Sequence, residues 1–564
     1  MNKNITVLLT CSGIGSRLGS ITKYTNKALA KIGKKPAIGY IIESYPKDTE
    51  FVITLGHFGS HVKQYLEMVY GDRNFKFVEV NNYSGPGSSP VLSQLCAKEL
   101  LNKPFFYHSC DTITFDNSYI DECLKTNKNV LIGYKTNSGQ YDSFDILPTR
   151  FDFDTDSKSI ITNLYSKGES TNANLSYVGI SYVYDYKTYW RCLENANINY
   201  GYLSPSDFCV YKNYNIHLFG YEINSWYDVG NVESLNIARN KFPDAFNILY
   251  KEKESIFIQD IDNKKYIIKF FADKNRVNNL VKRAESIKDY VAPIYKSSDN
   301  FLIYEYTEGD VLSNHLVPTH VNNLLHTIGE SMWSYIYSNI DTHKYKNEAI
   351  EFYITKTTNR INDLIEKYDI DLNKPVVINN FKDKPLYKTP NQIIKNAFDI
   401  INNKINTYVY PTKWHGDFIP DNIIRVTPYE YKLIDWRESF CGNTEYGDKY
   451  YDLAKLNHNL TVNHKIIYDN LFNVEINKNS DYDDVYVNIL TNYTMEEAKS
   501  CIEHFIKNGT PNLLFEHNDY AYVELLTGIV WLNMSPLHHN PFDLFLFYFG
   551  LHKLQTVLAK YYNI

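Results

Sequence analysis

The sequence lacks three features that would assign it to common function classes. Its eight cysteines include no C-x-x-C pair and no cluster with histidine, which disfavours structural zinc and favours reduced thiols in a cytoplasmic protein. Its apolar runs at 5–10 and 542–551 are too short for a signal sequence or a membrane span, so we expect no membrane insertion. Its formal net charge is −7, so no general basic surface for nucleic acid is expected.

The first part of the chain alternates strand-like with helix-like segments. The strand-like runs are followed by turns or helical candidates, and they lie at 5–10, 51–55, 75–80, 104–108 and 129–134. Helical candidates lie at 59–70 and 90–101, and residues 145–190 are richer in strand patterns. This alternation predicts an α/β domain with a Rossmann-like, mostly parallel sheet.

A second domain start is visible after residue 254. Residues 255–271 have the pattern of two strands across an Asp-Asn turn, followed by a helix-like stretch at 274–288 and a strand at 301–306. From 318 onward the pattern is mostly helical, including 444–475 and 494–507. We therefore predict two domains, 1–245 and 246–564, the second an α+β domain with a large helical lobe.

A glycine-rich turn directly after the first strand is the first candidate site. Gly13, Gly15 and Ser16 would place backbone N–H groups against phosphate oxygens. A dinucleotide site would need a third glycine at position 18, which is leucine here. Arg17 and Lys27 instead add two cations, which suits displacement at an α-phosphate with pyrophosphate leaving.

Residues 5–242 resemble the nucleotidyltransferase family that makes sugar nucleotides and CDP-choline. The resemblance rests on 10–18, 27–29 and 35–36, and it implies that Asp111 and Asp228 hold Mg²⁺ between the NTP and an acceptor phosphate. Each of these carboxylates would alternatively be a solvated turn residue. Thr-Cys-Ser at 10–12 departs from the usual Leu-Ala-Ala, so the base stays open between CTP and UTP.

Further residues match the same family pattern. Gly87 and Ser88 lie in a stretch that resembles the family's glycine loop beside the base or ribose, although a serine here would equally cap the following helix. Lys167 stands where the family has a lysine for the acceptor phosphate, and Gly179 matches a glycine of the acceptor-binding strand. A loop lysine such as Lys167 is as often only solvated.

The second candidate site is the run His415-Gly416-Asp417, with Asn422 five positions after the aspartate and Asp435 at the end of an apolar strand-like run. Phosphoryl transfer from Mg·ATP needs a carboxylate near the substrate hydroxyl, and an amide and a second carboxylate for the metal. His415 would orient the loop by hydrogen-bonding backbone. The spacing therefore predicts an ATP-dependent kinase site.

Together with Lys269 on its predicted strand, this set resembles the aminoglycoside phosphotransferase and choline kinase family over about 255–564. The resemblance implies that Asp417 is the catalytic base and that Asn422 and Asp435 are Mg²⁺ ligands. Lys269 would contact ATP phosphates, and Glu285 would orient it, although Glu285 also fits an exposed helical charge pattern. The hinge residues Glu305 and Tyr306 would hydrogen-bond adenine through their backbone.

The order of the two reactions suggests coupling. A kinase would phosphorylate a small hydroxylated substrate with ATP, and a nucleotidyltransferase would join that phosphate to an NMP with release of pyrophosphate. We therefore expect a bifunctional enzyme that makes an NDP-activated precursor for a surface polysaccharide such as capsule. A sugar or polyol is favoured as substrate, while choline or another amino alcohol stays open. A nucleotidyltransferase with a non-catalytic kinase-like module also stays open, as do oligomeric state and channelling.

Overall fold

A computed structural model describes residues 5–136, 141–146, 159–170, 172–200, 208–212, 218–242, 251–334, 336, 340–379, 388–408, 411–490, 493–511, 513 and 515–564. The chain forms two compact units. The first comprises Met1–Lys274 and Tyr295–Tyr304, and the second Asn275–Ile294 and Glu305–Ile564. The predicted boundary at 245 lies outside the described residues and stays a prediction. Within the part of the chain that is described, helices are too short or too polar to cross a bilayer.

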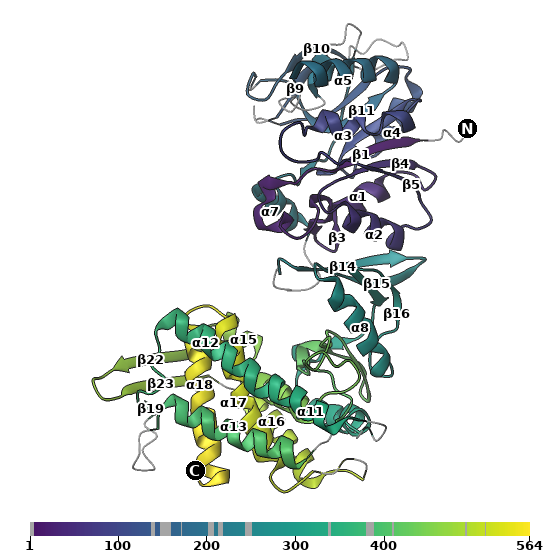
Figure 1. Cartoon of the computed structure of the whole chain (residues 1–564). Helices are drawn as coiled ribbons and strands as arrows, with labels where there is room; N and C mark the ends of the chain where they lie inside the picture. The colour runs from purple at the N-terminus through teal and green to yellow at the C-terminus, as the bar shows by residue number, and fades with distance from the viewer. Residues whose placement is uncertain are drawn as a thin grey trace. The chain divides into compact units, whose positions relative to one another are not determined.

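The first unit is built on a mixed nine-stranded sheet in the order β5-β4-β1-β6-β11-β8-β12-β10-β9 (Figure 1). The strands are β1 (Thr6–Cys11), β4 (Glu50–Leu55), β5 (Asn74–Glu79), β6 (Phe105–Ser109), β8 (Val130–Tyr134), β9 (Ser143–Ile146), β10 (Ser159–Tyr165), β11 (Leu175–Val183) and β12 (Phe219–Glu222). Only β10 and β11 run against the others in the pairings of this sheet. The sheet is therefore mostly parallel in strand direction, with antiparallel pairing in its second half.

Helices cover both faces of this sheet because its central strands are apolar throughout and buried. They are α1 (Ala37–Ser44), α2 (Gly59–Val69), α3 (Pro90–Leu95), α4 (Ser118–Lys125), α5 (Tyr186–Tyr200), α6 (Phe208–Lys212) and α7 (Val232–Lys241). Short elements complete the unit: the 3₁₀ helices η1 (Ser16–Thr22) and η2 (Lys27–Leu29), and the paired strands β7 (Thr112–Ile113) and β13 (Tyr227–Asp228). Because β1, β4 and β6 are parallel, the segments after them meet at one edge of the sheet.

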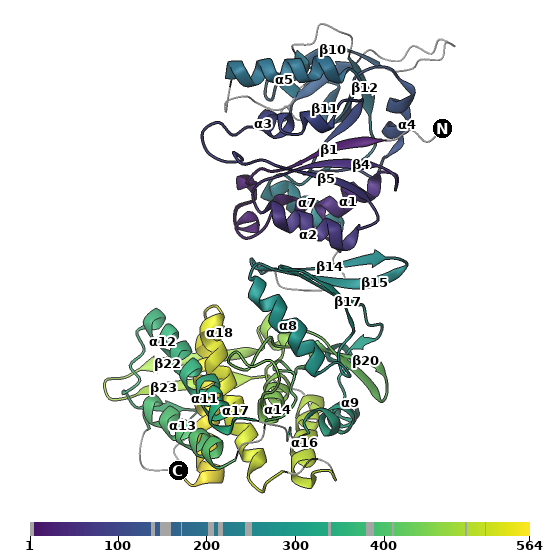
Figure 2. The same ribbon diagram turned by 45° about the vertical axis from the view of Figure 1, so that its right-hand side comes forward.

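A second, four-stranded sheet packs on α1 and α2 of the same unit (Figures 1 and 2). Its order is β14 (Glu254–Ile261), β15 (Lys264–Phe271), β17 (Phe301–Glu305) and β16 (Ile294–Ser297). The ring of Tyr65 on α2 lies 5.9 Å from the rings of both Phe257 and Phe301. Ile258 N also donates to Lys34 O (2.8 Å). Buried residues of both sheets and of these two helices belong to one hydrophobic core.

The second unit is mainly helical. Its longer helices are α8 (Lys274–Ser286, of which Lys274 belongs to the first unit), α9 (Pro318–Leu324), α11 (Thr342–Ile350), α12 (Lys356–Tyr368), α13 (Pro390–Thr407), α14 (Lys449–Asn459), α15 (His464–Tyr468), α16 (Tyr493–Asn508), α17 (Asp519–Met534) and α18 (Phe542–Val557). A π-helical turn, η7 (Glu351–Thr355), joins α11 to α12. Helices α17 and α18 are apolar on nearly all sides and pack against each other, with α12 and α13 beside them (Figure 1).

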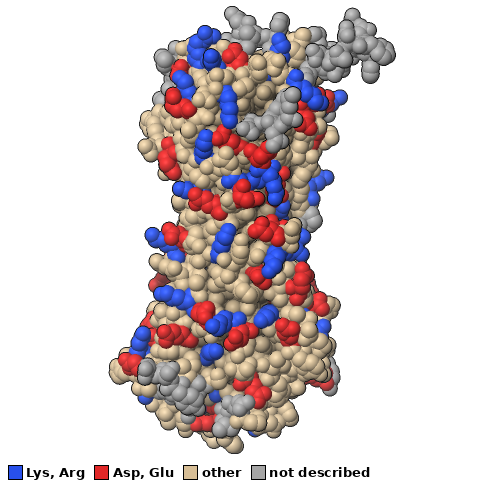
Figure 3. Space-filling model, turned by 90° about the vertical axis from the view of Figure 1, so that its right-hand side faces the viewer, with Lys and Arg blue, Asp and Glu red and all other residues tan. Residues whose placement is uncertain are grey.

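Two small sheets complete this unit: β18 (Asp310–Val311) with β20 (Ile423–Thr427) and β21 (Glu430–Leu433), and β19 (Val376–Ile378) with β23 (Asp483–Ile489) and β22 (Phe472–Lys478). The predicted helical stretch 444–475 is therefore wrong at its end, where β22 begins an antiparallel hairpin. Lysine and arginine side chains are interspersed with acidic ones over the visible face in Figure 3.

Candidate active sites

The glycine-rich turn after β1 folds back against Lys27. Gly15 has a φ of +70°, in the left-handed region that favours glycine, and its carbonyl accepts a hydrogen bond from Thr22 Oγ1 (3.1 Å). A Cβ at position 15 would lie 3.0 Å from Lys27 Cβ. Gly13 borders open space, and Ser16 is exposed at the start of η1. The turn thus leaves room for a ligand beside a lysine.

Asn26 holds the Lys27 segment in place. Its buried side chain donates from Nδ2 to Cys11 O (2.7 Å) and His57 O (2.6 Å), and its Oδ1 accepts from Ala28 N (2.9 Å). The first two bonds tie the start of η2 to the end of β1 and to the segment after β4, and the third caps η2 itself. The position of Lys27 is therefore set by two neighbouring strands rather than by its own loop.

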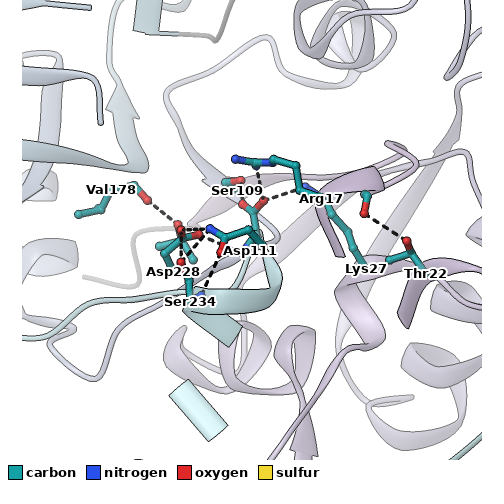
Figure 4. Close-up of polar contacts among 12 residues, drawn as sticks. Arg17, Thr22, Lys27, Ser109, Asp111, Val178, Asp228 and Ser234 are labelled. Atoms are coloured by element: carbon teal, nitrogen blue, oxygen red, sulfur yellow. Dashed lines mark hydrogen bonds and ion pairs between the residues drawn. The ribbon is translucent and has the colours of Figure 1, made fainter. Parts of the chain in front are cut away.

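Lys27 and Asp111 form a close ion pair beneath the turn. Lys27 Nζ lies 2.9 Å from Asp111 Oδ2, and Arg17 Nη2 lies 4.0 Å from the same oxygen (Figure 4). Ser109 Oγ donates to the other carboxylate oxygen, Oδ1. Lys27 and Asp111 are mostly buried, whereas the Arg17 side chain is 67% exposed and free to meet a ligand.

Asp228 lies close to Asp111, although it comes from a segment more than a hundred residues later in the chain. Strand β13 pairs with β7 so that Asp228 is opposite Thr112, the residue after Asp111. Asp228 Oδ1 accepts from Gly230 N (2.9 Å), and Oδ2 accepts from Ser234 Oγ (3.1 Å). A Cβ on Gly230 would lie 2.9 Å from Asp111 Oδ2 and 3.1 Å from Asp228 Oδ1, so the two carboxylates face each other across this glycine.

The pKa values of the two carboxyl groups, Asp111 and Asp228, are shifted in opposite directions. Burial raises the pKa of Asp111, but attraction to Lys27 and the Ser109 hydrogen bond outweigh it and lower the pKa to about 2. Burial lowers the pKa of Lys27, and attraction to Asp111 reverses this, so its pKa is raised. Burial and repulsion from Asp111 raise the pKa of Asp228 despite the Gly230 hydrogen bond. A cation placed between the two carboxylates would stabilise both in the ionised state.

These carboxylates fit a magnesium ion. Both offer hard oxygen ligands, and both are already oriented by hydrogen bonds from neighbouring groups, as metal-binding carboxylates commonly are. The repulsion that raises the pKa of Asp228 is what a divalent cation would remove.

Gly87 and Ser88 lie in the loop before α3. Gly87 is exposed with φ +89°, and Ser88 Oγ donates to Gly85 O (2.8 Å). The cap of α3 is Ser89, whose Oγ accepts from Leu92 N (2.9 Å). The capping alternative thus applies to Ser89 rather than Ser88, and the nucleotide-binding role of Gly87 and Ser88 stays a prediction.

The two predicted acceptor residues lie differently. A Cβ on Gly179, which has φ +81°, would be 3.1 Å from Ser109 Cβ, so this part of β11 passes directly beside the Asp111 segment. Lys167 is exposed in the turn between β10 and β11, where its backbone N donates to Asp142 Oδ1 (3.0 Å). The structure brings Gly179 to the Asp111 segment and shows no contact of Lys167 with it among the described residues.

In the second unit, a buried aspartate of α14 shapes the His415–Asp417 loop. Asp452 accepts from His415 N and Gly416 N, both at 2.7 Å, and from Trp333 Nε1 (3.1 Å). Burial raises the Asp452 pKa to about 6 despite these bonds. His415 Nε2 lies 2.9 Å from Ile434 O, and burial lowers its pKa to about 4. The His415 ring is therefore neutral, and its hydrogen bond to the Ile434 carbonyl holds the two backbone segments together.

Asp417 is held by an amide and by a lysine. Asn422 Nδ2 donates to Asp417 Oδ2 (2.9 Å) and to its carbonyl (2.9 Å), while Lys455 Nζ lies 2.8 Å from Oδ1. Burial raises the Asp417 pKa, but the attraction to Lys455 outweighs this and lowers it well below its usual range. With its amide nitrogen committed to Asp417, Asn422 offers its carbonyl oxygen as a hard ligand for Mg²⁺.

The other predicted kinase residues are dispersed over both units. Asp435 is exposed after β21 with φ +59°, and it offers a second hard ligand. Lys269 is buried on β15, with Nζ 5.6 Å from the centre of the Tyr304 ring. Glu285 is 75% exposed on α8 and pairs with Lys288 (2.9 Å), which matches the exposed helical pattern noted above. Their nucleotide and metal roles stay predictions.

The predicted hinge follows β17. Glu305 N donates to Pro293 O (3.1 Å), so this backbone donor is used within the protein. Tyr306 is half-buried. The adenine contacts expected of both residues stay predictions.

Sequence reasoning missed the residues that position the others. They are Asn26, Ser109 and Ser234 in the first unit, and Arg283 and Lys455 in the second. Arg283 is fully buried and donates to the carbonyl of Trp414, next to the His415 loop. In the sequence, only Arg283 and Lys455 could have been singled out, because each lies near motif residues in a stretch with a helical pattern.

No family model matches the chain, and no curated protein matches it. Among solved structures, an apo UDP-glucose pyrophosphorylase matches 43% of this chain and 98% of its own, at 17% identity and a TM-score of 0.37. CTP:phosphocholine cytidylyltransferase from Streptococcus pneumoniae matches 43% and 100% at 18% identity and 0.35. A putative glucose-1-phosphate thymidylyltransferase from Bacillus anthracis matches 44% and 98% at 19% identity and 0.34.

Proposed function

We propose that the chain is a bifunctional enzyme that first phosphorylates a small alcohol and then attaches a nucleotide to the new phosphate. The Lys27–Asp111–Asp228 arrangement carries the proposal for the first unit. The Asp417–Asn422–Lys455 arrangement carries it for the second. Both sets combine half-buried carboxylates with fixed cations, which is the arrangement that reactions of phosphate groups require.

At the first site, an oxygen of the acceptor phosphate attacks the α-phosphorus of an NTP. The bond to the β-phosphate breaks, and pyrophosphate leaves with the electron pair. Lys27 and Arg17 lie where they would offset the charge that builds on the triphosphate. The glycine turn lets the phosphates approach the backbone closely. CTP or UTP is the expected nucleotide.

At the second site, the acceptor hydroxyl attacks the γ-phosphorus of ATP, ADP leaves, and Asp417 accepts the hydroxyl proton. The low pKa of Asp417 keeps it ionised, so that it orients that hydroxyl and takes up its proton as the new bond forms, and the same low pKa lets it release the proton to solvent afterwards. Magnesium ions bound at Asp111 and Asp228, and at Asn422 and Asp435, would supply the positive charge that binds and polarises the phosphates.

The product of the second unit is the substrate class that the first unit requires. A sugar, polyol or amino alcohol phosphate would become an NDP-activated building block, as cytoplasmic synthesis of surface polysaccharide uses. Choline as the acceptor remains the alternative substrate.

The test is incubation of the full chain with ATP, each NTP and a panel of sugars, polyols and amino alcohols, followed by mass spectrometry. We expect a gain of one phosphate with ATP alone and of one NMP when a second NTP is added. On the alcohols, Asp417→Asn should abolish both gains, but it should leave the gain of one NMP on phosphate esters supplied directly. Asp111→Asn should abolish only the gain of an NMP. Asp363→Asn and Asp121→Asn, exposed in α12 and α4, serve as controls.

Two outcomes would contradict the proposal. If supplied phosphate esters gain an NMP but no alcohol gains phosphate, the kinase-like region is a binding module. If neither aspartate variant changes any NTP consumption, both enzymatic assignments fail.

A further inference from the structure

Three cations gather beside the His415–Asp417 loop in the second unit. Lys356 and Arg360 lie one helical turn apart at the start of α12, and Arg437 follows β21. Lys356 Nζ lies 4.9 Å and Arg437 Cζ 5.3 Å from the centre of the same ring, that of Phe352 in η7. We call these three residues the basic cluster.

Arg437 connects the basic cluster to the loop that carries Asp417. Its backbone N donates to His415 O (3.0 Å), and its Nε donates to Gly416 O (3.3 Å). A Cβ on Gly416 would lie 2.6 Å from Arg437 Cβ, so only glycine lets this arginine approach so closely. Arg437 is therefore fixed next to Asp417 by the loop itself.

The basic cluster has too little negative charge around it. Among the described residues, none of its three side chains has a carboxylate within 4.0 Å. The nearby acidic groups are engaged elsewhere: Asp417 pairs with Lys455 (2.8 Å), and Glu438 lies 3.7 Å from Arg276. Burial lowers the pKa of Arg437, and attraction to Tyr451, Asp417 and Glu438 outweighs it, so this arginine stays charged. Half-buried cations that lack an ion-pair partner are common where an anion binds.

The lowered pKa of Lys356 agrees with the excess of positive charge in the basic cluster. Burial lowers its pKa, and repulsion from Arg437 and Arg360 adds to the effect, despite attraction to Cys441 and Glu438; the resulting pKa is about 7. A bound anion would reverse this repulsion and keep the lysine charged.

We propose that the basic cluster binds an anionic group, a carboxylate or a phosphate, on the alcohol that is phosphorylated at Asp417. The inference rests on the proposed kinase function and specifies its substrate class. The half-buried Tyr451 ring, whose centre lies 5.7 Å from Arg437 Cζ, offers apolar surface that suits a carbon skeleton rather than a polyphosphate chain. Positive charge at this place would repel choline, so the cluster argues against that alternative.

The first test compares matched acceptors. Full-length protein is incubated with ATP and D-glycerate, glycerol, gluconate, glucitol or choline, and Asp417-dependent phosphorylation is measured by mass spectrometry. We expect each acid to have a kcat/KM at least about tenfold above that of its neutral partner, as one charged contact supplies. A preference for glycerol, glucitol or choline overturns the proposal.

The second test separates acceptor binding from ATP binding. Lys356→Met should raise KM for the acid about tenfold or more and leave KM for ATP within about twofold, whereas Lys356→Arg should keep most of the affinity. Lys395→Met, which removes an exposed charge from α13, is the matched control. A rise in KM for ATP instead would assign the cluster to the nucleotide and overturn the proposal.

The two tests give different results depending on whether the anion site or the kinase function is wrong. Phosphorylation that needs Asp417 but shows no preference for acids refutes only the inference. Absence of phosphorylation with every acceptor, unchanged by Asp417→Asn, refutes the kinase function, and the anion site with it.

Discussion

Replacing Gly230 by alanine should abolish nucleotidyl transfer without unfolding the first unit. The new methyl group would lie 2.9 Å from Asp111 Oδ2, 3.1 Å from Asp228 Oδ1 and 3.1 Å from Arg17 Nη2. Real Cβ atoms essentially never approach another atom within 3.0 Å, so at least the Asp111 oxygen must move by a few tenths of an ångström. The methyl group would also occupy the space between the two carboxylates.

The expected loss follows from that displacement. A displacement of a few tenths of an ångström is smaller than the misplacement of about 1 Å that costs about a hundredfold in rate, so most of the loss would come from the methyl group excluding the metal; together we expect kcat/KM to fall by about 100-fold or more. Pyrophosphate release from CTP or UTP with a phosphate ester acceptor measures it, and the melting temperature checks folding.

Gly39→Ala in α1 is the matched control, since its Cβ would be nearly as crowded, 3.1 Å from Tyr70 Oη, but belongs to neither proposed site. Nucleotidyl transfer by Gly230→Ala within about threefold of the parent would refute the assignment of Asp111 and Asp228 as a shared metal site. Loss of ATP-dependent phosphorylation in the same variant would show a general folding defect instead.

Two further predictions concern single ion pairs. Lys455→Met removes the cation 2.8 Å from Asp417, so the carboxyl pKa should rise and the acid limb of kcat/KM for phosphorylation should move up by about one pH unit or more; an unmoved limb contradicts the pairing. At Glu50, burial raises the pKa, but hydrogen bonds from Lys76 and Lys103 outweigh it and lower the pKa to about 2. Because the folded pKa is depressed, this stabilisation is present above the unfolded pKa of about 4.3 and is lost as pH falls toward 2. Glu50→Gln should therefore cost at most about 2–3 kcal/mol in urea unfolding at pH 7, with the difference from the parent narrowing below pH 5 and not above it.

Much of the first unit could be predicted because its signals are local. Apolar runs bounded by turns gave the positions of β1, β4, β5, β6 and β8, and a short motif nominated Gly15 and Lys27. The hairpin β22–β23 was missed although both strands alternate apolar with polar residues, at 472, 474 and 476 and at 485, 487 and 489, because the first strand follows a helical stretch directly and the predicted helical stretch 444–475 runs into it.

The contacts that complete each site could not be predicted for a different reason. Asn26 acts on carbonyl groups of two other segments, and Lys455 reaches Asp417 from a separate helix. Side chains of this kind follow no spacing rule, since only the packed tertiary structure decides which strand end or loop they meet. A polar residue on a helix face that is otherwise apolar was the best indication in the sequence that such a side chain makes a contact within the protein.

The four-stranded sheet of residues 254–305 has a consequence for dissecting the protein. The chain crosses between the two packing units three times, after residues 274, 294 and 304, so no single cut yields both units intact. A fragment ending at 245 would lose the strands that cover Tyr65 on α2 and would present that ring to water. A fragment beginning at 246 would carry those strands with their apolar side uncovered. Expressed separately, each half would be prone to self-association, so inactive fragments would say nothing about either chemistry; point variants of the intact chain are the informative route.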